Sequence, residues 1–76
     1  MSDFDLAAAL ADSIRRDRAE LSALARCRRL MKRPEPIKVS DLAEWLMARH
    51  DLSGVASLQI ARRAARHACE RSRYRP

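Results

Sequence analysis

Apolar residues follow helical spacing in three stretches of the chain, and nowhere do they alternate in the way of a β-strand. The first stretch, 3–33, contains no proline or glycine and is rich in alanine, leucine and arginine, which are strong helix formers. Pro34 and Pro36 end it, because a proline disfavours helical geometry at the residue before it. The pattern predicts an all-α fold of three helices, at about 3–33, 41–50 and 55–73.

Within the first helix, apolar residues recur in the alternating three- and four-residue steps of a heptad repeat. A continuous helix over this stretch is about 45 Å long at 1.5 Å per residue, so it overhangs anything that the rest of the chain can build. We therefore expect it to pair with a second copy in a homodimer, through Leu10, Ile14, Asp17, Leu21, Leu24 and Met31. Arg28 occupies one more position on this seam. The alternative is a helix that is bent or broken near Asp12–Ser13 or Asp17–Arg18 and packs within a monomer.

A proline-containing linker, 34–39, joins the first helix to the rest of a single domain, 1–76. Ser40, followed by Asp41 and Glu44, favours a helix start, since serine caps free backbone amides and acids suit the positive end of a helix. We expect this second helix to bury one face, made of Leu42, Trp45 and Leu46.

The third helix follows Gly54, the only glycine of the chain, and either Ser53 or Ser57 is placed to cap it. Small residues at heptad-like spacing predict a narrow buried face that allows close packing, formed by Leu58, Ala61, Ala65 and Ala68. The opposite surface is predicted to carry Arg62, Arg63, Arg66 and His67.

The chain is strongly basic, and the charge lies in blocks. Sixteen Lys and Arg oppose ten acids, for a net charge of +6, and residues 57–76 hold six arginines against one acid. A second block, 25–38, holds six bases against one acid. This balance indicates a phosphate-rich or acidic partner. Fourteen of the bases are arginine, which binds phosphate in a planar fork, although fourteen alanines beside them equally suit a chain that uses arginine on ordinary solvated surfaces.

The turn and the start of the third helix contain Leu52-Ser53-Gly54-Val55, followed by Ile60 and by Ala61-Arg62-Arg63. This sequence resembles the helix-turn-helix family of DNA-binding regulators over about residues 42–63. In that family an apolar residue follows the turn glycine, and a second buried aliphatic residue lies five positions later. The resemblance implies that the following helix lies in the major groove. It places Ser57, Gln59 and Arg62 nearest base edges, and Arg63, Arg66, Arg71 and Arg73 on phosphates.

Nothing in the sequence indicates an enzyme or a cofactor. One glycine excludes a glycine-rich phosphate loop, and a chain of 76 residues has little room for an enclosed active site. Cys27 and Cys69 lack C-x-x-C spacing, which predicts free buried thiols and no metal. A metal site that adds His50 and His67 is disfavoured, because His67 and Cys69 are two residues apart on one helix and face different ways.

The chain begins with acids where a secretory signal has bases, and no run approaches the length of a membrane span, so we expect a cytoplasmic protein that does not contact membranes. These features favour a small DNA-binding protein, a transcriptional regulator. The alternative is a helical inhibitor or anti-activator, as carried by mobile genetic elements, that binds an acidic or nucleic-acid-binding surface of another protein.

Overall fold

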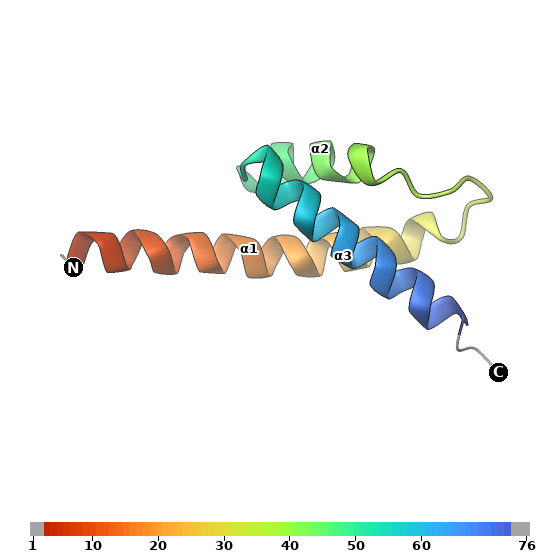
Figure 1. Ribbon diagram of the computed structural model, residues 1–76, viewed down its shortest axis with the longest axis horizontal. Coiled ribbons are helices and arrows are strands. Elements are labelled where there is room, and N and C mark those ends of the chain that lie inside the picture. The colour runs from red at the N-terminus through yellow and green to blue at the C-terminus, as the bar shows by residue number, and fades with distance from the viewer. Residues whose placement is uncertain (1–2, 74–76) are drawn as a thin grey trace.

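A computed structural model of the chain describes the backbone of residues 3–73 and the side chains of residues 5–69. It contains three helices, α1 (Asp3–Leu30), α2 (Val39–His50) and α3 (Gly54–Arg73), and no strand within the described range. Figure 1 shows α3 crossing α1, with α2 beside both. The predicted all-α fold of three helices is confirmed.

The first helix, α1, is unbroken, so the alternative of a break near Asp12 or Asp17 is wrong. It ends at Leu30, three residues before the predicted end at Arg33. The Met31 amide still donates to the Cys27 carbonyl at 2.9 Å, after which the next two amides donate only three residues back. The helix therefore tightens into a turn ahead of Pro34.

The second helix, α2, begins one residue before Ser40, so the prediction that Ser40 caps it is wrong. Lys38 is the N-cap residue and makes no side-chain hydrogen bond to the helix; its carbonyl accepts from the Leu42 amide at 3.1 Å. At the other end Asp51 adopts a left-handed conformation with φ of 52°, which aspartate tolerates better than most residues. Its amide donates to the Met47 carbonyl and so closes the last turn of α2.

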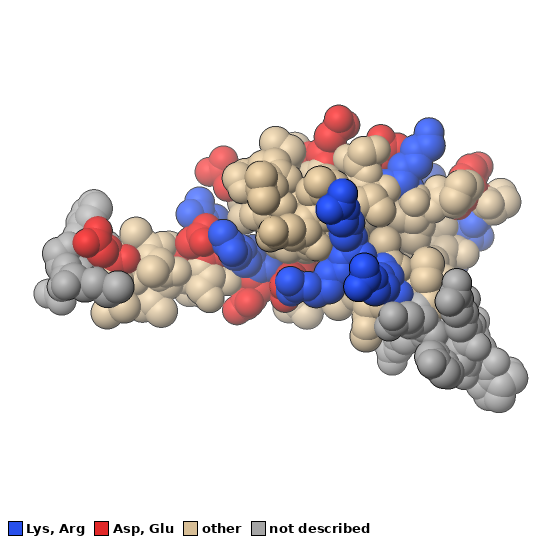
Figure 2. All heavy atoms as spheres, viewed as in Figure 1, with Lys and Arg blue, Asp and Glu red and all other residues tan. Residues whose placement is uncertain are grey.

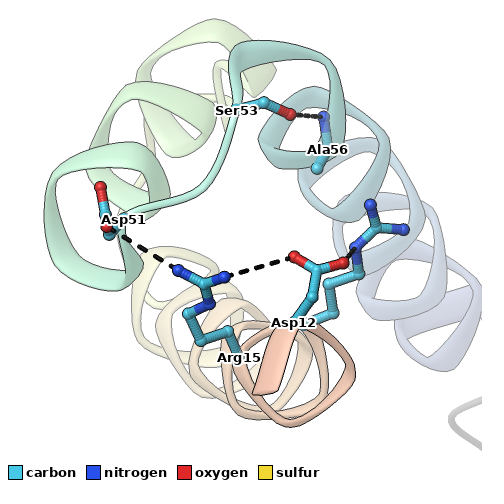
Figure 3. Close-up of polar contacts among 6 residues, drawn as sticks. Asp12, Arg15, Asp51, Ser53 and Ala56 are labelled. Carbon is cyan, nitrogen blue, oxygen red and sulfur yellow. Dashed lines mark hydrogen bonds and ion pairs between the residues drawn. The ribbon is translucent and has the colours of Figure 1, made fainter. Parts of the chain in front are cut away.

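Ser53, and not Ser57, caps α3. The Ser53 hydroxyl accepts a hydrogen bond from the Ala56 amide at 3.2 Å, and this satisfies one of the free amides in the first turn. Figure 3 shows this contact in the short connection that leads from α2 into α3.

The core is built largely from small side chains. Ala19, Ala23 and Cys27 of α1 are buried in one cluster with Ala61, Ala64 and Ala68 of α3 and with Leu42 and Leu46 of α2. The absence of bulky groups lets α1 and α3 approach closely. Ala64 takes the buried position that was predicted for Ala65, and both Leu58 and Trp45 are only half-buried against the cluster.

Within residues 5–30, the other two helices bury only the C-terminal part of α1. Ala19 is the first buried residue among the described side chains of the helix, and the side chains from Asp5 to Arg18 are exposed apart from the half-buried Asp12. In Figure 1 the N-terminal half of α1 extends beyond α2 and α3. The overhang predicted from helix length is therefore present.

Candidate nucleic-acid interface

The outward face of α3 carries a row of polar and basic side chains. Gln59, Arg62 and Arg66 are exposed and follow one another at three- and four-residue steps, which place them on one side of a helix. This set is the basic stripe. It lies opposite the buried Ala61, Ala64 and Ala68. Figure 2 shows lysine and arginine side chains gathered where α3 crosses α1.

The two arginines of the basic stripe have no acidic partner among the residues whose side chains the structure describes. They stand four residues apart on one face, where like charges repel each other by a few tenths of a kcal/mol. An anion placed over the stripe would remove that repulsion and occupy both guanidinium groups.

Arg63 lies beside the stripe but has a partner within the chain. Its Nη1 donates to Oε1 of Glu20 on α1 at 2.7 Å, between two exposed side chains. This pair links α3 to α1 and neutralises one of the charges that were predicted to bind phosphate.

Ser57 does not belong to the surface, so its assignment as a base-contacting residue is wrong. It is fully buried, with an exposed fraction of 0%, and its hydroxyl has no hydrogen-bond partner in the described structure. The reason is the helix start: because Ser53 caps α3, Ser57 falls one turn inside the helix on the face that packs against the core.

Of the two apolar positions in the expected helix-turn-helix pattern, the structure buries one. Ile60 is buried, as the pattern requires, whereas Val55 is 71% exposed. The remaining predicted phosphate contacts, Arg71 and Arg73, have side chains that lie outside the described residues.

Two arginines of α1 contact acids of the same chain. In Figure 3, Arg15 lies between Asp12 of its own helix and Asp51 at the end of α2, at 3.7 and 3.8 Å. Arg16 contacts Asp12 through its Nε at 3.1 Å. Arg15 therefore ties the overhanging part of α1 to the connection between α2 and α3, whereas Arg16 is neutralised within α1.

Part of the second basic block lies beside α2. The guanidinium of Arg26 lies 4.6 Å from the centre of the Trp45 ring on α2, and that of Arg49 lies 5.4 Å from it. These are cation–π distances, which the sequence pattern did not indicate. Arg26 also lines a hollow of about 290 Å³ that contains both bases, Arg33 and Lys38, and acids, Glu35 and Asp41. This region is of mixed charge and lies on the α2 side of α1.

Most residues of the predicted dimer seam are exposed. Leu10, Ile14 and Leu21 are large apolar side chains exposed at 57%, 51% and 70%. Asp17, Arg28 and Met31 are also exposed, and Leu24 alone is half-buried against the core. The described residues of one chain therefore leave this face of α1 mostly uncovered.

The two cysteines differ. Cys27 is buried, as predicted, whereas Cys69 is exposed, which corrects the expectation that both are buried. Burial raises the pKa of the Cys27 thiol, and the negative charge of a Cys69 thiolate raises it further. No cluster of three or more His, Cys, Asp or Glu side chains suited to a metal occurs in the described part of the chain.

Comparisons with protein-family models, with curated proteins and with solved structures each found no match. Within residues 3–73, no helix combines the length and the apolar character that crossing a membrane requires.

Proposed function

We propose that the chain is a small DNA-binding protein, a transcriptional regulator, that pairs through α1 and binds phosphates with the basic stripe of α3. The observation that carries this proposal is that Arg62 and Arg66, on the face of α3 opposite the core, contact no acid among the side chains of residues 5–69. Arginine binds phosphate oxygens through two parallel donors, and Gln59 beside them is a donor and acceptor for a base edge.

The contrast among the arginines supports this assignment. Arg15, Arg16 and Arg63 contact acids of the same chain, whereas the two arginines of the stripe contact none of the acids whose side chains are described. A surface that serves only solubility is favoured by acidic and basic side chains placed among each other. The overhang of α1 has this arrangement, with Asp12 beside Arg15 and Arg16. A single-sign stripe instead suits a polyanion, whose bound counterions are released on contact.

A second candidate is a helical inhibitor or anti-activator that binds an acidic or nucleic-acid-binding surface of another protein. The observation that favours it is Val55, which is 71% exposed at the start of α3 on the same side as the basic stripe. Met47, also exposed, approaches the same helix start, with its Sδ 3.8 Å from the position of a Cβ on Gly54. Exposed apolar anchors beside arginines are typical of protein interfaces.

The two candidates separate in one experiment. The full chain is used as bait in a lysate with and without nuclease, alongside a mobility shift on DNA at about 50 to 200 mM salt. A shift that weakens steeply with salt, and no stoichiometric protein retained after nuclease, is expected. A retained protein partner with no DNA shift contradicts the regulator proposal.

Matched variants locate the DNA-binding surface. Replacing Arg62 and Arg66 by alanine removes the two charges of the basic stripe and is expected to weaken DNA binding about tenfold per arginine. Replacing Arg15 and Arg16 by alanine changes the net charge equally, but these arginines contact Asp12, so DNA binding should change much less. Equal weakening in the two variants would show that only net charge matters and would count against the stripe.

A further inference from the structure

The exposed seam of α1 combines large apolar residues with one acid and one base, and this pattern favours one partner in one orientation. We infer that the seam binds a second copy of this chain in antiparallel orientation, in the register that sets Asp17 of each copy against Arg28 of the other. The inference rests on the pairing through α1 in the proposed function and does not depend on DNA binding.

The seam is a separate face of α1. Ala19, Ala23 and Cys27, which pack on α2 and α3, repeat every four residues on one side of the helix. Leu10, Ile14 and Leu21 lie toward the other side and meet no part of the described chain that buries them. Large apolar side chains at heptad spacing on a free helix face are the pattern that a second helix covers.

The two charged seam residues disfavour a parallel pair. A two-fold pair of parallel helices is necessarily in register, so each seam residue faces its own copy. Asp17 would then face the partner's Asp17, and Arg28 would face the partner's Arg28. Two like-charge contacts in one seam oppose association.

The antiparallel register turns both contacts into ion pairs. When Asp17 lies opposite the partner's Arg28, the residues between them are matched as well: Leu21 lies opposite the partner's Leu24 and Ile14 opposite the partner's Met31. A shift by one heptad in either direction instead places a charged residue against a leucine, which buries charge without a partner. One register therefore satisfies all the seam residues from Ile14 to Met31.

A hollow beside the seam fits this arrangement. A cavity of about 180 Å³ opens between α1 and α3 next to Leu24 and is lined by Glu20, Leu24, Ile60, Arg63, Ala64 and His67. In the antiparallel register the partner's Leu21 lies opposite Leu24, at the mouth of this hollow. Leu21 is 70% exposed in one chain, so its insertion would cover an apolar side chain and fill the space between the two helices.

The orientation also decides where the two basic stripes lie. Arg63 of α3 contacts Glu20, which is next to the seam residue Leu21 in the sequence. Successive residues of a helix are about 100° apart around its axis, so α3 lies about 100° around α1 from the seam. The two-fold axis of an antiparallel pair is perpendicular to both helices and to the line joining them. The rotation that relates the two copies therefore places both α3 helices on the same side of the paired α1 helices. Both basic stripes then face one way, whereas a parallel pair would place them on opposite sides.

Charge reversal tests the register. Asp17→Arg alone and Arg28→Asp alone each create two like-charge contacts, and each should weaken self-association at least tenfold in sedimentation equilibrium. The double variant, D17R with R28D, restores opposite charges and should recover the dimer. Both residues are exposed in one chain, so circular dichroism should show unchanged helix content.

Cross-linking tests the orientation separately. In a background with Cys27→Ala and Cys69→Ser, a mixture of Ile14→Cys and Met31→Cys chains should oxidise to a mixed disulfide dimer. Ile14→Cys alone should not cross-link, because two copies of residue 14 would be about 25 Å apart along the antiparallel pair. A double charge variant that stays monomeric like the single ones, a monomeric native chain, or efficient cross-linking of Ile14→Cys to itself would overturn the inference. Failure to bind DNA would leave these results unaffected, so the two proposals fail separately.

Discussion

From Ala19 to Leu30, α1 packs small side chains against the other helices, whereas before Ala19 it projects into solvent with Leu6, Leu10 and Ile14 exposed. Both halves contain the same residue types, chiefly alanine, leucine, arginine and acids. What differs is the size of the residues on each face. Within α1, close packing against the other helices uses alanine and cysteine, and most of the large apolar residues lie on a surface that the described chain does not cover.

This difference separates stability from assembly. The buried half holds the three helices together through contacts that tolerate little extra volume. The exposed half contributes few contacts within one chain, so changes there should leave folding nearly intact. Changes at the exposed residues of the seam, which runs along both halves, should affect association. The following changes test that division, from the largest expected effect to the smallest.

Adding volume to the covered half should destabilise the fold. Ala23→Leu places a large side chain where Ala23 has no exposed surface, and we expect a decrease of about 1 to 3 kcal/mol in the free energy of unfolding, measured by urea denaturation. Ala9→Leu is the matched control on the overhang, where the side chain is exposed and helix propensity barely changes. Equal destabilisation by the two variants would contradict the difference between the halves.

The cysteines give a second comparison, of a buried thiol on α1 with an exposed one on α3. Burial raises the pKa of Cys27, so its reactive thiolate is scarcer at pH 8 than that of an ordinary thiol. We expect a maleimide reagent to label Cys69 at least ten times faster than Cys27, as read from peptide mass spectrometry of the folded chain. Faster labelling of Cys27 would show that the α1 core is open.

The same thiol links pH to stability. Because the folded pKa of Cys27 lies above the unfolded value, the folded chain holds this proton more tightly. Its contribution to stability is fully present below the unfolded pKa and is lost as pH rises through the folded pKa. Cys27→Ala should therefore flatten the alkaline part of a plot of unfolding free energy against pH.

The smallest effect is expected at the link between α1 and α3. Glu20→Gln removes the charge that Arg63 contacts at 2.7 Å, but both side chains are exposed, so we expect a decrease of only about 0.2 to 1 kcal/mol in unfolding free energy. A double-mutant cycle with Arg63→Gln isolates the pair. A coupling well above this range would mean that the link is a main support of the fold.

The helices themselves were predictable from the sequence because prolines and a single glycine mark their ends and a local pattern decides each one. The exposed positions of Gln59, Arg62 and Arg66 were likewise predictable, since helical periodicity separates them from the alanines. Ser57 was not, because its burial depends on which of two serines caps α3. That choice is made by the geometry of the connection after Asp51 and not by residue type.

Contacts between residues far apart in the sequence could not be predicted from the spacing of residues along one helix. The ion pair of Glu20 with Arg63 and the stacking of Arg26 on Trp45 each join two helices, and no spacing along one helix indicates them. The same limit applies to Cys69: its position relative to α1 depends on how α3 crosses that helix. Periodicity defines the faces of a helix, and tertiary packing decides which face is covered.

The salt dependence of DNA binding tests the proposed function most directly. The logarithm of the binding constant is measured against the logarithm of salt concentration for the native chain and for the variant with Arg62→Ala and Arg66→Ala. If these arginines neutralise phosphates, the native slope is steep, and the variant slope is shallower by roughly 0.9 for each phosphate that the variant leaves unneutralised. Parallel lines for the two proteins, or binding by the native chain that does not respond to salt, would contradict the account.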